Sequence, residues 1–501
     1  MNWSQLFARK DLNELLVDMK GDQRLKRCLG PVNLTSLGVG AVIGAGIFVA
    51  TGKAASETAG PALMISYIVA GMTCIFAALC YAEFASMAPV AGSAYTYAYI
   101  TMGELFAWII GWDLVLEYAV GAATVANGWS GYFQTVISKA GLHFPSSLNR
   151  ATVVFENDQF VLTGSYFNLP AVLIVAIMTF ILVKGISESA GFNALMVFIK
   201  VAAVVFVILV GSFYIHPENW TPFAPYGWTG LNIFGYHVAG ETNAAQEPVG
   251  MLAGAAIIFF AYIGFDSVST HAEEARNPQR DVPIAIIASL LICTILYVAV
   301  VAVLTGMVKY DQIDKDSGIS SAFKNAGIPW AEVIIATAGV AGITSVLLVM
   351  MLSAPRVFLA MARDGLVPKA FFADVHPTFR TPWKSTIAIG VFVAFLAGFL
   401  PIDALLHLTN IGTLFAFVIV CAAVLVMRYT NPDAPRPFRC PLVPLVPLLG
   451  IGACLTLMFS LPAANWLRLI AWMGLGLAIY YFYGMKHSTL RKGPATPTIE
   501  S

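Results

Sequence analysis

The stretch NLTSLGVGAVIGAGIFVATG, residues 33–52, is apolar enough for a lipid bilayer, yet it contains the glycines Gly38, Gly40, Gly44, Gly46 and Gly52. Each glycine inside a helix costs about 1 kcal/mol relative to alanine, but glycine also permits unusual backbone angles and the close approach of a ligand. A bilayer tolerates broken backbone only where protein or a water-filled cavity covers it. The stretch therefore predicts a covered gap between two half-helices at residues 43–47, Ile-Gly-Ala-Gly-Ile.

Such a gap has a chemical consequence. The first N–H groups of the second half-helix have no partner within the helix, so they can bind a small anion such as a carboxylate. The alternative interpretation is close packing of small residues between helices, because Gly40 and Gly44 form a GxxxG pair. This stretch alone fits both interpretations.

The composition is that of a polytopic membrane protein. Of the 501 residues, 58% are hydrophobic and 11% are charged, and the mean hydropathy is +0.77, whereas a soluble domain is about 25% charged. A net charge of zero gives no nucleic-acid footprint. The seven cysteines form no CxxC motif, so neither a metal cluster nor a disulfide is indicated. No GxxxxGK[ST] loop is present, which argues against ATP as the energy source, and no cofactor or enzymatic chemistry is indicated.

Twelve segments are long and apolar enough for a membrane span, which needs about 20 residues. They are 33–58, 61–87, 105–135, 168–186, 191–214, 249–270, 283–308, 331–361, 384–400, 402–427, 442–461 and 466–485. An even number places both ends of the chain on one side. Twenty Lys and Arg residues fall in the segments of that side, and seven fall in the opposite segments. This bias predicts that the tails 1–32 and 486–501 are cytoplasmic in a protein of the cell's inner (plasma) membrane.

The sixth span, MLAGAAIIFFAYIGFDSVST (251–270), is interrupted as well, by Gly254, Gly264 and the acid Asp266. Two interrupted spans five apart indicate an inverted repeat, with a binding site at the midplane where the broken helices meet. The sequence thus predicts an all-α polytopic fold with a 5+5 repeat. The two repeats are 33–214 and 249–427, and the last two spans, 442–485, lie outside them.

Four motifs, in order along the chain, now carry a resemblance. They are GVGAVIGAGIFVATG (38–52), PVAGSAYTY (89–97) followed by Gly111-Trp112, EEARNPQRDVPIAI (273–286) and PRVFLAMARDGLVPKAF (355–371). Together they resemble the amino acid–polyamine–organocation transporter superfamily, and the third resembles its cationic amino acid transporter family. The resemblance implies the LeuT-like 5+5 fold, alternating access and amino acid transport. Twelve spans are similar to the bacterial branch.

The resemblance also implies how an amino acid backbone is bound. The N–H groups of Ala45, Gly46 and Ile47 would hold its carboxylate. Relatives often have a small hydroxyl residue at the place of Ala45, so a side-chain contact is not implied there.

The α-ammonium group would bind carbonyls freed by the two breaks, near Ile43 and around Phe260, Ala261 and Ile263. In relatives an aromatic residue at the place of Phe260 closes over the substrate as a gate, although an ordinary core phenylalanine is the alternative.

Two further residues are candidates for the substrate pocket. Asp266 is an acid at span depth, and such residues are usually functional. It could line the pocket, attract a cationic side chain or cap a half-helix. Met350 matches a family position that lines the pocket, where a bulky side chain would favour small neutral amino acids. The alternative for Met350 is gap filling in the core.

Two charged residues are candidates for ion coupling. Glu117 lies four residues after Asp113 on the same face of the third span. It matches an acidic position of bacterial members and is our candidate proton site, with a structural acid as the alternative. Lys200 matches a lysine that occupies the sodium position of sodium-coupled relatives, which implies no sodium requirement.

Other acids and arginines fall near the cytoplasmic ends of the spans. Glu83 is expected to anchor a loop. An inner gate of ion pairs is expected among Glu273, Glu274, Arg276, Arg280, Arg356, Arg363 and Asp364.

The sequence therefore predicts proton-coupled import of L-amino acids, small neutral ones such as alanine or cationic ones. Exchange of amino acids or polyamines, and a non-transporting amino acid receptor of the same fold, remain open. So do the preferred amino acid, the stoichiometry, the oligomeric state and any accessory subunit.

Overall fold

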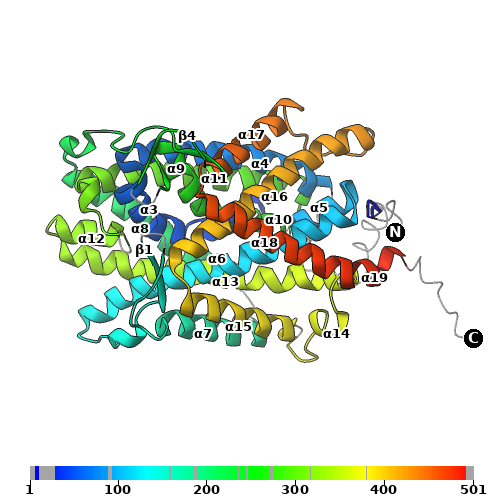
Figure 1. Cartoon of the computed structure of the whole chain (residues 1–501), viewed down its shortest axis with the longest axis horizontal. Coiled ribbons are helices and arrows are strands. Elements are labelled where there is room, and N and C mark those ends of the chain that lie inside the picture. Colours follow the sequence, from blue (N-terminus) through cyan, green and yellow to red (C-terminus); the bar gives the residue numbers. More distant parts are fainter. Residues whose placement is uncertain are drawn as a thin grey trace, which may run out of the picture.

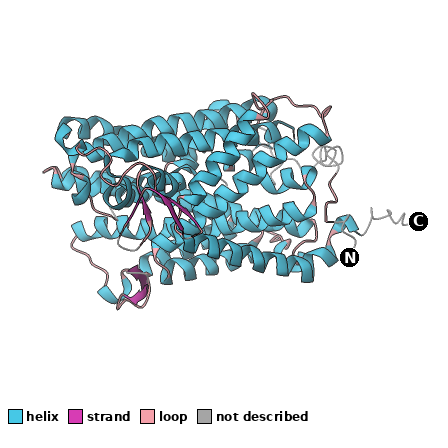
Figure 2. Ribbon diagram, turned by 45° about the horizontal axis from the view of Figure 1, so that its top comes forward, coloured by secondary structure: helices cyan, strands magenta, loops and turns pink. Residues whose placement is uncertain are grey.

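The computed structural model describes residues 6–10, 29–87, 93–156, 159–185, 190–234, 236–243, 246–270, 272, 275–315, 318–379 and 381–491. The predicted gate residues Glu273 and Glu274 and parts of both predicted tails lie outside these residues. The described chain is mainly helical, and its long helices run roughly along the long axis of the molecule (Figures 1 and 2).

The α-helices of the described residues are α2 (Pro31–Val42), α3 (Thr51–Ala54), α4 (Leu63–Met87), α5 (Ser93–Thr101), α6 (Glu104–Lys139), α7 (Leu169–Lys184), α8 (Ala190–Gly211), α9 (Met251–Ile258), α10 (Ser267–Thr270), α11 (Pro278–Met307), α12 (Gly318–Asn325), α13 (Pro329–Arg363), α14 (Lys369–Phe372), α15 (Trp383–Phe399), α16 (Ile402–Thr430), α17 (Leu445–Phe459), α18 (Ala463–Ile479) and α19 (Met485–His487). Their bounds differ from those of the predicted spans by a few residues at most places.

Six short strands, which the sequence analysis did not predict, accompany the helices. They form the antiparallel pairs β1 (Val153–Glu156) with β2 (Gln159–Leu162), β3 (Leu231–Ile233) with β4 (Tyr236–Ala239), and β5 (Glu241–Thr242) with β6 (Pro248–Val249). All six belong to the connections between α6 and α7 and between α8 and α9.

Eight helical segments of the described chain are long and apolar enough to cross a membrane by length and composition. They are Pro31–Met87, Glu104–Lys139, Leu195–Tyr214, Met251–Ser269, Pro278–Met307, Pro329–Arg363, Ile402–Thr430 and Ala463–His487. Three shorter apolar helices, α7, α15 and α17, accompany them.

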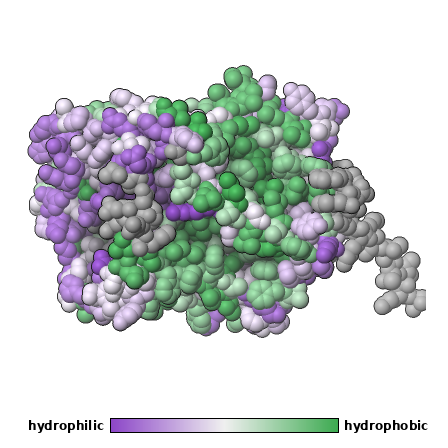
Figure 3. All heavy atoms as spheres, in the orientation of Figure 1, coloured by the Kyte–Doolittle hydropathy of each residue, from purple (hydrophilic) through white to green (hydrophobic). Residues whose placement is uncertain are grey.

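The outer surface of these helices is suited to lipid. Phe180, Phe198, Ile295 and Phe395 are among the large apolar side chains that lie exposed. Figure 3 shows apolar residues over the middle of the visible face and hydrophilic residues gathered at one end of the molecule. Contiguous exposed apolar surface of this extent is foreign to a soluble protein and is expected in a bilayer. The chain is therefore a multi-pass membrane protein.

The first long segment, Pro31–Met87, contains a reversal of the chain. The hydroxyls of Thr51 and Tyr67 are 2.6 Å apart, whereas a continuous helix would separate these residues by about 24 Å. Gly60 makes the turn with φ +61°, and a Cβ at this position would lie 2.4 Å from Pro225. Glycine is needed here because a side chain would meet both an unfavourable backbone angle and a clash.

Both described ends of the chain meet at one end of the helix bundle. Near the N-terminus, the N–H of Glu104 donates to the carbonyl of Ala8 (3.0 Å), and Lys10 forms an ion pair with Asp364. Near the other end, the N–H of Thr489 donates to the carbonyl of the same Asp364 (3.0 Å). The strands lie toward the opposite end of the molecule (Figure 1).

The predicted anchoring role of Glu83 is confirmed. This buried carboxylate on α4 accepts from Arg428 (2.8 and 3.0 Å), from Arg436 (3.2 Å) and from the N–H of Cys440 (2.7 Å). Charge-assisted bonds of this kind are stronger than neutral ones. They fix the connection between α16 and α17 to the rest of the bundle.

Candidate substrate-binding site

The predicted break in the first span is present. Helix α2 ends at Val42, and Ile43 is extended (φ −71°, ψ 107°). A π-helical turn, Gly46–Ala50, then leads into α3. The N–H of Phe48 donates to the Gly44 carbonyl (3.2 Å), so the N–H groups just before it, on residues 45–47, have no acceptor in their own half-helix.

The packing interpretation of the same glycines also applies. A Cβ on Gly40 would lie 2.5 Å from Val197 of α8, and one on Gly44 would lie 2.4 Å from Val346 of α13. Both distances are too short for a real side chain. The glycines therefore let two different helices approach the broken span closely, in addition to the break itself.

The sixth span is broken as well. Helix α9 ends at Ile258, a 3₁₀ turn covers Phe259–Tyr262, and the chain resumes helical structure at α10. Between them Gly264 has φ +115°, and a Cβ there would lie 2.8 Å from the carbonyl oxygen of Ala41. Only glycine fits this combination of backbone angle and close approach without strain.

The two breaks face each other. A Cβ on Gly46 would lie 2.1 Å from the Cα of Ala261, so the first break packs directly on the second. The Tyr297 hydroxyl of α11 lies 2.9 Å from the carbonyl oxygen of Val42 and 3.0 Å from that of Ala261. A hydroxyl has one proton to donate, so it serves one of these freed carbonyls at a time and bridges both breaks.

Other freed carbonyls already have donors. The Asn410 amide on α16 donates to the carbonyls of Ala256 (2.8 Å) and Ile257 (2.9 Å), which the 3₁₀ turn releases from helical bonding. The Phe260 carbonyl accepts from the N–H of Ile263 (3.2 Å). Of the carbonyls expected to bind an ammonium group, those of Phe260 and Ala261 are therefore shared with protein donors.

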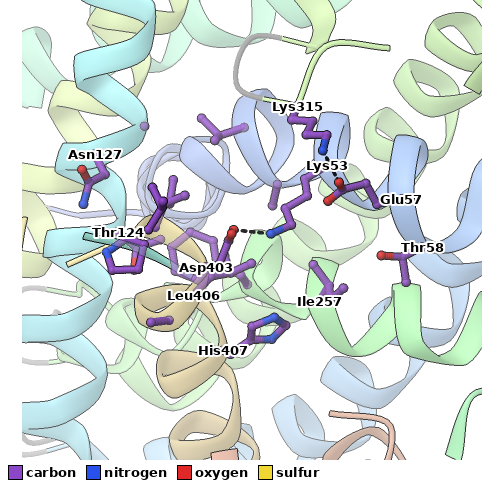
Figure 4. A pocket seen from close by; sticks show the side chains of 18 of the residues that line it. Lys53, Glu57, Thr58, Thr124, Asn127, Ile257, Lys315, Asp403, Leu406 and His407 are labelled. Atoms are coloured by element: carbon purple, nitrogen blue, oxygen red, sulfur yellow. Dashed lines mark ion pairs between the residues drawn. The ribbon is translucent and has the colours of Figure 1, made fainter. Parts of the chain in front are cut away.

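A cavity of about 800 Å³ is lined by residues of both broken spans and by strand residues such as Val154 and Val249. Figure 4 shows side chains that line it. Of the predicted substrate residues, Ala45 and Phe260 line it. The remaining ones are buried behind its wall: Ile43, Gly46, Ile47, Ala261, Ile263, Asp266 and Met350. Val49, Thr124 and Ile257 also line the cavity.

Asp266 belongs to a group of buried carboxyls rather than to the cavity wall. One of its oxygens accepts from the Tyr118 hydroxyl (2.5 Å). Both oxygens of Asp113 and of Glu117 lack a hydrogen-bond partner among the described residues. Thr413, a neighbour of Glu117, donates instead to the Thr409 carbonyl (3.1 Å).

Lys200 is fully buried between α2 and α13. Its ammonium group donates to the Gly40 carbonyl in the last turn of α2. Gly342 of α13 leaves room for its stem, because a Cβ there would lie 3.3 Å from Lys200 Cγ. Carbonyls in the last turn of a helix lack helical partners and carry the negative end of the dipole. The amine therefore caps the first half-helix next to the break.

Met350 is buried on α13 against the third span. A Cβ on Gly121 of α6 would lie 3.2 Å from its sulfur. Met350 does not line the cavity. It could limit the length of the substrate pocket only by fixing the position of α6, against which it packs.

The predicted inner gate has a different pairing from the one expected. Asp364 forms its ion pair with Lys10, and it accepts from the Tyr95 hydroxyl (2.6 Å). Within the described ranges no ion pair includes the expected arginines, which are Arg276, Arg280, Arg356 and Arg363. The partner of Asp364 comes from a segment that is remote in the sequence.

Tyr297 and Asn410, which hold the broken backbone, were not predicted from the sequence. A signal for Asn410 existed, since it is an amide in the apolar run of residues 402–427 and polar groups at span depth need partners. Tyr297 gave no such signal among the 18 tyrosines of the chain.

Comparison with known proteins agrees with this geometry. The amino acid permease family model matches residues 29–484. The methylthioribose transporter of Bacillus subtilis (strain 168) is 43% identical over 98% of this chain and 100% of its own length. The branched-chain amino acid permease BcaP of the same organism is 45% identical over 97% and 99%. The vacuolar cationic amino acid transporter 4 of Arabidopsis thaliana is 40% identical over 86% and 68%. Two broken helices that meet at a cavity, in a chain matched over nearly its full length, show that it belongs to the amino acid permease family of the amino acid–polyamine–organocation superfamily.

Proposed function

We propose that this protein imports small neutral L-amino acids by alternating access and that the import is coupled to protons. The observation that carries the proposal is the pair of broken helices facing each other at the inner part of the cavity. Membership of the amino acid permease family supports an amino acid as the substrate.

The fold behind this proposal is the twelve-span 5+5 repeat. Pro31–Met87 reverses at Gly60 and counts as two spans, and the three shorter apolar helices complete the twelve. Helices five spans apart pack on each other: α4 on α11, α6 on α13, and α7 on α15. This pairing supports the repeats 33–214 and 249–427, with 442–485 outside them.

The orientation in the proposal places both tails in the cytoplasm of a cell whose plasma membrane holds the protein. The positive-inside bias supports it, and both described chain ends meet at Asp364. The cavity then opens to the outside, while Lys10 and Tyr95 hold Asp364 on the closed inner side.

The amino acid backbone would bind at the meeting point of the breaks. The N–H of Ala45, with those of Gly46 and Ile47 behind it, would hold the carboxylate. The carbonyls of Ile43 and Ile263 would bind the ammonium group. The carbonyls of Phe260 and Ala261, which already accept from protein donors, would contribute to the same contact. Phe260 on the cavity wall would close over the substrate.

Proton coupling would use the buried acids. Asp113, Glu117 and Asp266 each have at most 1% of their surface exposed, and within the described part of the chain none has an ion pair. Neighbouring buried carboxyls cannot all be ionised without a cation, so at least one is expected to hold a proton. We propose that Glu117 carries the transported proton. Asp266 instead holds the Tyr118 hydroxyl in place through its hydrogen bond. Lys200 replaces a sodium ion.

The experiment is uptake of radiolabelled L-alanine into proteoliposomes, without sodium and with or without an inward proton gradient. Glu117→Gln keeps the shape of the side chain and should abolish gradient-driven uptake while counterflow exchange continues. Asp311→Asn, in a partly exposed ion pair, is the matched control. Uptake only into preloaded vesicles would identify an exchanger, and binding without flux would identify a receptor.

A second candidate substrate follows from the relatives. One of the most similar proteins is named for methylthioribose, which is a thioether sugar without the ammonium and carboxylate groups. The candidates are distinguished by testing whether unlabelled methylthioribose, L-arginine or L-valine competes with labelled L-alanine for uptake. If methylthioribose competes and neither amino acid does, methylthioribose rather than an amino acid is the substrate.

A further inference from the structure

The cavity wall between the breaks and the outside carries a net positive charge. Four basic side chains line it, Lys53, Arg150, Lys315 and Arg468, against three acidic ones, Glu57, Glu247 and Asp403. Neighbouring charges of one sign in a recess raise the concentration of the opposite sign and repel their own. The sign of this wall therefore opposes a cationic substrate.

Each of the three acids in the wall also has a partner. Lys53 forms an ion pair with Asp403, and Lys315 forms one with Glu57. The Asn243 amide donates to Glu247 (3.1 Å). Within the described wall, an incoming guanidinium or ammonium group therefore meets only carboxylates that already have a partner, and ion pairs neutralise two of the three.

The Lys53–Asp403 pair has a special position. Ala45, Val49 and Lys53 follow at four-residue intervals along the first span, so they lie on one face of it, and all three line the cavity. Lys53 lies about 12 Å beyond Ala45 along that face. In Figure 4 the Lys53 side chain reaches across to Asp403, which stands one helical turn outward from Leu406 and His407.

A long side chain that extends outward from an amino acid bound at Ala45 would approach this pair. If the chain ends in a cation, it meets the ammonium group of Lys53 and a carboxylate whose charge is already neutralised. A neutral side chain loses nothing by the same contact, because Val49 and Ile257 line the path.

We infer that Lys53 is a specificity-determining residue: by masking the Asp403 carboxylate it makes the site accept neutral amino acids and reject cationic ones. The inference rests on the proposed binding of amino acids at the breaks. It adds the residue that sets the preference for neutral over cationic amino acids.

The test uses Lys53→Met, which keeps the length of the side chain and removes its charge. L-Arginine is compared with L-citrulline, a neutral molecule of nearly the same shape, as competitors of L-alanine binding to purified protein. A cation a few ångströms from a bare carboxylate in a partly hydrated site gains at least about tenfold in affinity. The ratio of arginine to citrulline affinity should therefore rise about tenfold in the variant and return to the wild-type value in Lys53→Met/Asp403→Asn.

Lys315→Met is the matched control. It frees Glu57, a carboxylate about as exposed as Asp403 (37% against 36%). Glu57 follows Lys53 by one further turn of the first span, so it lies farther from Ala45 than Lys53 does. The arginine-to-citrulline ratio of this control should stay at the wild-type value.

A melting curve shows whether Lys53→Met is folded. If it is not, the charge swap Lys53→Asp/Asp403→Lys is used in its place. The swap keeps an ion pair and should keep the low arginine ratio. An unchanged ratio in a folded Lys53→Met that still binds L-alanine overturns the inference and leaves the proposed function standing. A rise in the charge swap, or loss of alanine binding in a folded Lys53→Met, also overturns it. Failure of the wild-type protein to bind any L-amino acid overturns the proposed function and this inference with it.

Discussion

Removal of one oxygen atom tests whether the two broken helices act as a unit. Tyr297→Phe deletes the hydroxyl that lies 2.9 Å from the Val42 carbonyl and 3.0 Å from the Ala261 carbonyl. The ring keeps its contacts with Tyr67 and Tyr262, whose centroids lie 5.3 and 5.5 Å away. The variant should therefore fold. A buried acceptor without its donor costs about 1–3 kcal/mol, which corresponds to an affinity change of about 5- to 150-fold if the bridge orders the site.

The assay is L-alanine binding to purified protein, measured as ligand-dependent thermal stabilisation, together with uptake into proteoliposomes. Tyr99→Phe is the control, because the buried Tyr99 hydroxyl donates to Glu104 (3.1 Å) and Tyr99 belongs to neither break. It should lower the melting temperature with little change in alanine affinity. If both variants show the same affinity for alanine as the wild type, the hydroxyl does not organise the site and the reasoning is wrong.

Three further predictions concern other ties within the bundle. Lys200→Met should leave the Gly40 carbonyl without its donor, at a cost of about 1–3 kcal/mol, and should reduce uptake into sodium-free proteoliposomes; a melting temperature and an uptake rate equal to those of the wild type would refute the assignment of the amine. Glu83→Gln should leave Arg436 buried without its counter-charge, at a cost of about 3–5 kcal/mol, and a melting temperature equal to that of the wild type would contradict this. Gly264→Ala should impose about 1–3 kcal/mol of backbone strain at φ +115° and reduce uptake, whereas Gly452→Ala, where a Cβ meets nothing within 4 Å, should be silent.

The breaks and the position of Lys200 could be read from the sequence because their causes are local. Five glycines in one apolar span have few explanations, and a lysine with two turns of apolar residues on either side has to find a partner inside the protein. The structure places both features where the sequence puts them in the spans.

The partners of these features could not be predicted, because they depend on the packing of helices remote in sequence. Tyr297 reaches both breaks only through the way α11 crosses them. Asp364 was expected to pair with nearby arginines, and it pairs with Lys10, 354 residues away. A charge pattern shows that partners are needed, and the tertiary fold decides which ones are used.

The amine of Lys200 has a further consequence for the protein in its surroundings. An ion that caps a helix must be captured from solution, so its occupancy rises and falls with the salt content of the medium. A tethered amine is present at a fixed effective concentration in every molecule. The contact between Lys200 and the end of α2 is thus independent of salinity. If the protein works as proposed, its uptake rate should therefore be the same at low and at high sodium concentration.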